Sequence, residues 1–143
     1  MKPLIVLGVA AVTGLGAQAS PCTASHFTDE HGKTYLSAET ALLEDEAPGR
    51  AVGILDTLQA SNLNCYEALA AHRMKAAALV ELKDFEAAIG ELKIVLEHPL
   101  LSTEEKAREA YNIGQLYGVL GDQEAAAPYL EMSETLKAGA EED

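Results

Sequence analysis

The chain has 143 residues, of which 48% are hydrophobic, and its 23 acidic and 10 basic residues give a formal net charge of −13. This length is sufficient for a single domain with one hydrophobic core. The acidic excess argues against nucleic-acid binding, which requires clustered lysine and arginine, and against docking on anionic lipid. Solubility is the simplest role of the charge, and attraction of a basic partner is the alternative.

Residues 1–19 have the pattern of a secretory signal peptide. Lys2 provides a positive start, Leu4–Leu15 form a short apolar run, and a small-x-small cleavage site ends at Ala19. A membrane anchor is the alternative, but the run is shorter than the roughly 20 apolar residues that span a bilayer. We therefore expect cleavage after Ala19, a protein that is periplasmic or otherwise exported, and no membrane span in the remaining chain.

Residues 20–36 form a segment before the first expected helix and contain Cys22. The other cysteine is Cys65, and an even pair in an exported chain suggests a disulfide. Such a bridge would tie residues 20–36 to the start of a helix. A free, buried thiol at Cys65 is the alternative.

Residues 37–136 carry the helix signals and are expected to form the folded domain, followed by an acidic tail at 137–143. Apolar residues recur there every three or four positions, and the sequence shows no strand-like alternation, so the predicted fold class is all-α. The boundary signals, in chain order, are the turn Ala47–Gly49, the Asn64/Glu67 capping box, the N-cap Asp84, the helix-ending Pro99, the Ser102/Glu105 capping box and the N-cap Asp122.

The last pair of expected helices repeats the pair before it. Residues 111–136 can be aligned with residues 72–98 at a spacing of 38 residues, and a weaker copy in residues 37–60 matches clearly only at Ala51. The aligned positions are Gly114 with Ala76, Tyr117 with Leu79, Gly121-Asp122 with Lys83-Asp84, and Ala126 with Ala88.

These positions resemble the tetratricopeptide repeat (TPR), a helix–turn–helix family of about 34 residues per repeat. The resemblance implies a solenoid of about three repeats, two clear and one degenerate. It assigns repeat packing to Ala76, Leu79, Ala88, Gly114, Tyr117 and Ala126. The sequence departs from the family pattern at Lys75, where an apolar residue is usual, and at Pro128, which lies inside an expected helix.

The glycines of the last repeat have separate explanations. Gly114 and Ala126 are small because the two helices of the repeat are expected to cross there. Gly121 is expected to close the first of these helices in a left-handed conformation. Gly118 either leaves room for another group that lies close to the helix or is tolerated there despite its low helix propensity.

The sequence shows no convincing catalytic or metal site, so the protein is predicted not to be an enzyme and to need no cofactor. Cys22, His26 and His31 are close in sequence, but their spacing fits no zinc pattern and a fourth ligand is not apparent. Solvated loop residues are the simpler interpretation of this group. His72 falls at a helix-packing position, where a core histidine is the ordinary explanation.

The TPR resemblance implies a partner-binding groove lined by the first helices of the repeats. By register its residues are Arg73, Met74, Ala77, Val80, Glu81, Arg108, Tyr111, Asn112, Gln115 and Val119. Asn112 would bond the backbone of a bound peptide, and Arg73 or Arg108 would meet a carboxylate. The full carboxylate clamp of some chaperone cofactors of this family is not matched.

The expected function is that of a periplasmic adaptor or scaffold that binds a peptide or helix of a cell-envelope protein. Small periplasmic TPR accessory proteins, which the chain resembles, serve envelope assemblies. A chaperone or holdase for unfolded clients is the rival function. The last helix adds a second expectation, a homodimer or partner contact through Tyr129, Met132 and Leu136.

Overall fold

The computed structural model describes residues 22–142, and this part of the chain is entirely helical apart from its turns and loops. The all-α prediction is therefore confirmed, as is a repeat-like arrangement of helices. The helices are α1 (Asp29–Leu43), α2 (Pro48–Gln59), α3 (Cys65–Glu81), α4 (Phe85–Leu96), α5 (Thr103–Val119) and α6 (Gln123–Glu141). The signal-peptide prediction lies outside the described residues.

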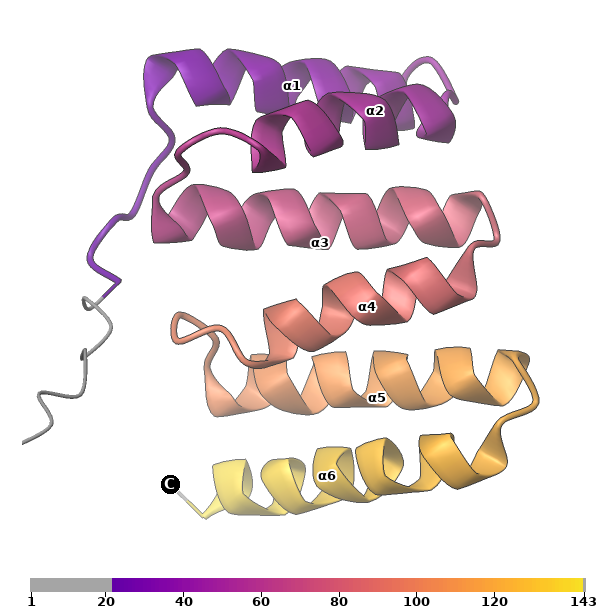
Figure 1. Ribbon diagram of the computed structural model, residues 1–143. Coiled ribbons are helices and arrows are strands. Elements are labelled where there is room, and N and C mark those ends of the chain that lie inside the picture. The colour runs from indigo at the N-terminus through magenta and orange to yellow at the C-terminus, as the bar shows by residue number, and fades with distance from the viewer. Residues whose placement is uncertain (1–21, 143) are drawn as a thin grey trace, which may run out of the picture.

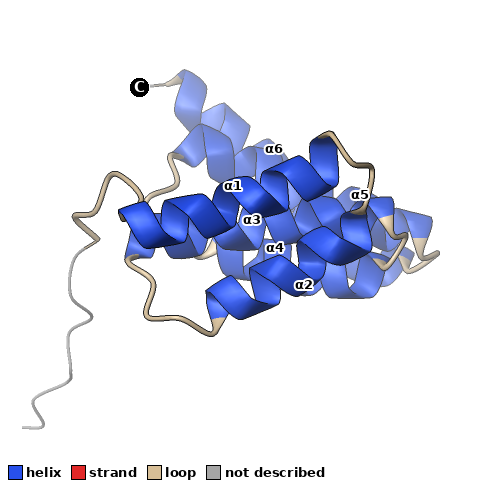
Figure 2. Ribbon diagram, turned by 90° about the horizontal axis from the view of Figure 1, so that it is seen from above, coloured by secondary structure: helices blue, strands red, loops and turns tan. Residues whose placement is uncertain are grey.

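The helices stack in chain order, each packed on the next (Figure 1). The turns α1–α2, α3–α4 and α5–α6 all lie at one end of the stack, which we call the turn end, and the longer loops α2–α3 and α4–α5 lie at the other. Figure 2 looks down on α1 and α2 and shows the remaining helices stacked behind them. The backbones of α3 and α5 do not approach each other closely, because α4 lies between them and contacts both.

The helix starts follow the capping signals in the sequence. Asn64 and Ser102 each form a complete capping box, with Glu67 and Glu105 as the returning glutamates. The side chain of Asp84 accepts a hydrogen bond from the N–H of Ala87 at the start of α4, and Asp122 does the same at the start of α6. These contacts satisfy backbone donors that the first turn of a helix leaves free.

The core between the helices is built largely from alanines and branched aliphatic residues. One cluster near α1–α3 centres on Leu55 and Leu58, and another joins α3, α4 and α5 around Leu92 and Ile113. All six residues assigned to repeat packing are buried or packed against this core. Small side chains let the helices approach closely, and this proximity accounts for alanine at so many buried positions.

Gly114 lies at a close approach of α5 and α6. A Cβ atom added there would be 2.6 Å from Leu130 Cδ2, 2.7 Å from Leu130 Cγ and 3.4 Å from the carbonyl oxygen of Ala126. A Cβ at Gly118 would meet nothing within 4 Å, so a close neighbour does not explain that glycine. Gly121 closes α5 with φ +80°, and Lys83 takes the equivalent left-handed position after α3 with φ 59°.

Gly114→Leu is expected to destabilise the fold by about 1–3 kcal/mol, because the new side chain overpacks the α5–α6 contact. Gly118→Ala is the matched control and should gain about 0.5–1 kcal/mol from helix propensity alone. Urea unfolding followed by far-UV circular dichroism measures both changes. Equal stability of Gly114→Leu and the wild type would show that the two helices do not need a small residue there.

The structure moves two boundaries of the expected folded domain. Helix α1 begins at Asp29, inside the segment 20–36, and Asp29 and Glu30 in its first turn complement the helix dipole. Helix α6 continues to Glu141 through the expected tail, whose alanines and glutamates favour helix. Pro128 lies inside α6, which continues past it. The third repeat expected in residues 37–60 stays a prediction.

Candidate functional site

The N-terminal segment is fastened to the start of α3 by a disulfide and by a buried carboxylate. The disulfide joins Cys22 to Cys65, whose Cα atoms are 5.6 Å apart, and neither cysteine is free. The ring of Phe27 also packs on Tyr35 of α1 and Tyr66 of α3, with centroids 4.6 and 5.5 Å away. The tether expected from the sequence is therefore present, and it is reinforced by aromatic packing.

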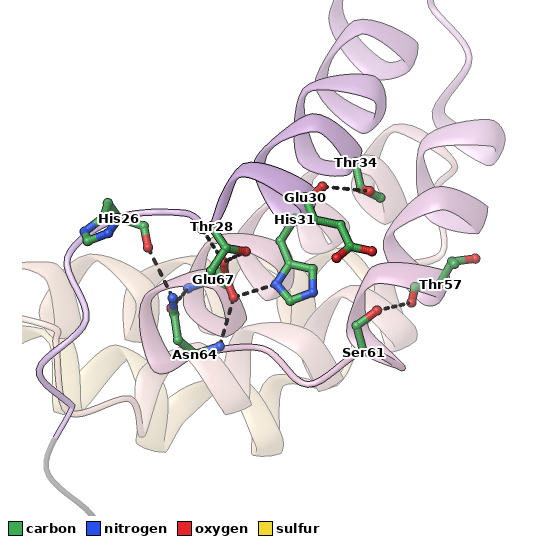
Figure 3. Close-up of polar contacts among 9 residues, drawn as sticks. All are labelled: His26, Thr28, Glu30, His31, Thr34, Thr57, Ser61, Asn64 and Glu67. Carbon is green, nitrogen blue, oxygen red and sulfur yellow. Dashed lines mark hydrogen bonds and ion pairs between the residues drawn. The ribbon is translucent and has the colours of Figure 1, made fainter.

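We call Thr28, His31, Asn64 and Glu67 the Glu67 cluster (Figure 3). Oε1 of Glu67 accepts hydrogen bonds from the N–H of Thr28 at 2.7 Å and from its hydroxyl at 2.8 Å. Oε2 lies 2.8 Å from Nδ1 of His31 and accepts the N–H of Asn64 at 2.9 Å. One side chain thus joins the segment before α1, α1 itself and the N-terminus of α3.

The Glu67 carboxylate is charged and fully engaged. Burial by itself would raise its pKa, but the hydrogen bonds from the Thr28 and Asn64 backbones, His31 and the Thr28 hydroxyl lower the pKa to about 2. The side chain is only 1% exposed, and each oxygen already has two partners. The arrangement suits a structural anchor, and it leaves no free oxygen to accept a proton from a substrate.

The three residues considered as metal ligands from the sequence, Cys22, His26 and His31, do not form a site. Cys22 is in the disulfide, and His31 is bound to Glu67. His26 contributes its backbone carbonyl to Asn64. Within residues 22–142, no group of three histidine, cysteine, aspartate or glutamate side chains is placed to hold a metal ion.

A second polar cluster lies between α2, α3 and α4 and explains the unusual Lys75. Its ammonium group is 2.8 Å from Asp56 and 2.9 Å from Glu91, and Nδ1 of His72 is 2.5 Å from Glu91. Burial opposes ionisation of Glu91, but hydrogen bonds from His72, Lys75 and Gln59 lower its pKa to about 2. His72 is therefore not the core histidine expected from the sequence; it takes part in an ion-paired network between helices.

A groove runs along the face formed by α1, α3 and α5, and it consists of two adjoining hollows. The first, of about 400 Å³, lies between α1, α2 and α3, and the second, of about 430 Å³, lies between α3 and α5. Ala77 and Glu81 line both, so we treat them as one surface, the α1–α3–α5 groove. Its lining is Leu42, Leu43, Glu46, Pro48, Arg73, Ala76, Ala77, Val80, Glu81, Leu92, Glu109, Asn112, Gln115 and Leu116.

Six of the ten residues predicted from the register line this groove. They are Arg73, Ala77, Val80, Glu81, Asn112 and Gln115. The floor between α3 and α5 includes the buried side chains of Ala76 and Leu92, so apolar surface lies below a polar edge. This combination is typical of surfaces that bind peptides.

The remaining four predicted groove residues lie elsewhere. Met74 packs against the core cluster around Leu55 and Leu58. Arg108 and Tyr111 line a separate hollow of about 220 Å³ with Lys137 of α6, whose ammonium group is 5.3 Å from the centre of the Tyr111 ring. Val119 is 64% exposed at the last position of α5. Met74 thus packs on the core, Arg108 and Tyr111 lie beside α6, and Val119 is exposed to solvent at the end of α5.

The structure assigns Arg73 a different role from the expected one. Its guanidinium group is 3.2 Å from Glu105 and 3.5 Å from Glu109, both on α5. The amide of Asn112 donates to Glu109 at 3.4 Å. The groove arginine is therefore paired within the protein and is not left free to meet the carboxylate of a partner.

Sequence reasoning missed the contribution of the first hairpin to the groove. Leu42, Leu43 and Glu46 line the first hollow, but the weak repeat in residues 37–60 gave no register for placing them. It also missed three exposed side chains at the turn end: Leu43 and Val119 are the last residues of α1 and α5, and Leu82 follows the last residue of α3. The signal would have been a leucine or valine repeated at the end of each of these helices.

The last helix leaves little apolar surface open. Tyr129 stacks on Tyr117 with ring centroids 5.8 Å apart, and Lys93 lies over both rings. Leu136 is half-buried, so only Met132 of the three residues expected at a dimer contact is exposed. The expected dimer through this helix stays a prediction.

Two features of the described residues bear on the compartment and on membrane insertion. A disulfide is typical of an oxidising, exported environment. None of the helices in residues 22–142 combines the length and apolarity needed to cross a bilayer. Comparison of the chain with family models, curated proteins and solved structures gives no match.

Proposed function

We propose that the protein is a non-enzymatic adaptor of the TPR type that acts in the periplasm or another exported compartment. It binds a peptide or helix of an envelope protein in the α1–α3–α5 groove. The observation that carries this proposal is the continuity of the two hollows across all three helix pairs, with Ala76 and Leu92 at the base and amides at the edge. The disulfide and the resemblance at Gly114, Tyr117 and Ala126 support the compartment and the type of protein.

Ala77 provides a direct test, because it is exposed and lines both hollows. Ala77→Trp would fill the middle of the groove without changing the buried core. Affinity capture from an envelope extract with the disulfide-bonded protein should recover a saturable partner, and Ala77→Trp should lose it by about tenfold or more. Ala127→Trp, at an exposed alanine of α6, is the matched control and should keep the partner.

Retention of every partner by Ala77→Trp would reject the groove as the binding site.

The alternative function, a holdase, predicts a different result, since the exposed side chains of Leu43, Leu82 and Val119 would contact unfolded chains. In that case both tryptophan variants would suppress aggregation of a denatured client as well as the wild type. A single saturable partner would not be recovered.

A further inference from the structure

The fixed charges around the α1–α3–α5 groove are mainly negative. Three carboxylates, those of Glu46, Glu81 and Glu109, line it against the single guanidinium group of Arg73. Arg73 is neutralised by Glu109 and by the nearby Glu105. Among the described residues, no unpaired cationic side chain therefore lines the groove, so the lining does not attract an acidic partner.

Two of these carboxylates remain available to a ligand. Within residues 22–142, neither Glu46 nor Glu81 forms a salt bridge. Glu81 is the last residue of α3 and is exposed, and Glu46 lies in the α1–α2 turn with φ 49°. Both line the first hollow, so they act on the same bound segment.

Apolar side chains lie directly beside these carboxylates. Leu43 lines the first hollow with Glu46 and Glu81 and is 69% exposed, and Val80 continues the apolar lining into the second hollow. A ligand that satisfies this surface must offer apolar side chains to Leu43 and Val80. It must also offer positive charge to Glu46 and Glu81.

We infer that the groove is specific for a cationic amphipathic peptide segment, in which lysine or arginine side chains alternate with apolar ones. This inference rests on the proposed function and names the chemistry of its partner. It reverses the expectation from the sequence that arginines of the groove would bind a carboxylate. Complementary charge of this kind determines selectivity and the rate of association more than the total affinity.

Three synthetic peptides of about 18 residues, enough for five helical turns, test the inference. They share the same leucines and carry lysine, glutamine or glutamate at the other positions. Fluorescence anisotropy with the disulfide-bonded protein should show the lysine peptide binding about tenfold more tightly than the glutamine peptide, with the glutamate peptide weakest. Raising the salt from about 50 to 500 mM should remove most of that difference.

A pair of variants separates local charge from the overall charge of −13. Glu46→Gln/Glu81→Gln should weaken the lysine peptide about tenfold and leave the glutamine peptide unchanged. Glu124→Gln/Glu131→Gln removes two exposed carboxylates of α6 and should leave both unchanged. Equal weakening by the two double variants would overturn the inference, because the attraction would then come from net charge.

The outcomes distinguish the inference from the proposed function. Equal affinity for the lysine and glutamine peptides, both abolished by Ala77→Trp, would keep the groove and overturn only its charge preference. Binding of none of the peptides would overturn both. A dimer by sedimentation that Ala77→Trp dissociates would assign the groove to a second copy of the chain and overturn the inference as well.

Discussion

Glu67→Ala is expected to destabilise the protein by about 3–5 kcal/mol at neutral pH, the usual cost of removing one partner from a buried charged network. The substitution leaves four hydrogen-bonding partners without their acceptor, from Thr28, His31 and Asn64. It also removes one half of the capping box that begins α3. Urea unfolding followed by circular dichroism measures the loss.

Glu67→Gln keeps the shape of the side chain and tests whether charge is needed. Its amide group would place donors against donors, so most of the destabilisation should remain. Glu124→Gln on the exposed surface of α6 is the matched control and should change stability by less than about 0.5 kcal/mol. If Glu67→Gln were as stable as the wild type, the carboxylate would not be the anchor of the N-terminal segment.

The pH dependence follows from the lowered pKa of Glu67. A carboxyl group whose pKa falls from 4.5 in the unfolded chain to about 2 in the fold stabilises the fold fully above pH 4.5. This contribution is lost as the pH falls from 4.5 towards 2. Consequently, the stability difference between the wild type and Glu67→Gln should narrow as the pH falls from 5 to 3.

Cys22→Ser/Cys65→Ser is expected to cost about 4 kcal/mol, the chain-entropy value for a bridge across a sequence separation of 43. The bridge reduces the conformational entropy of the unfolded chain and also holds Phe27 and Thr28 against α3. Chemical reduction of the wild type should reproduce the effect in a urea titration. A loss below about 1 kcal/mol would mean that the noncovalent contacts alone hold the segment.

A double-mutant cycle relates these two predictions. Once the disulfide is absent, Thr28 is less firmly placed beside Glu67, so Glu67→Ala should cost less in that background. A coupling energy of about 1 kcal/mol or more would show that the disulfide and the carboxylate stabilise the N-terminal segment cooperatively. Strict additivity would show that they act independently.

The helices of residues 64–136 could be read from the sequence because their boundaries are local. The pairs Asn64/Glu67 and Ser102/Glu105 are three residues apart, and the geometry of a first helical turn brings them together. The start of α1 at Asp29 was not predicted, because Gly32 lies near the start of the helix and His31 stands where a capping box would have glutamate or glutamine. Tertiary contacts through Phe27 and Glu67 order this region instead.

The groove could be predicted only as far as the repeat register reached. Ala77 and Gln115 line the hollow between α3 and α5, in keeping with the register, because their helical phase is set by buried neighbours such as Ala76 and Ile113. The pairing of Arg73 with Glu105 and Glu109 depends on how far apart α3 and α5 lie, which is a property of the packed stack. Side-chain charge in a groove therefore cannot be judged from one helix alone.

Helices α3 and α5 are separated by α4, and this arrangement sets the width of the groove. Its two long walls are joined by the ion pairs of Arg73 with Glu105 and Glu109, and Leu92 and its neighbours in α4 pack between them as a spacer. A larger or smaller side chain at this spacer changes the distance between the walls as well as the depth of the floor. Selectivity for ligand thickness thus resides in a residue at the base of the groove.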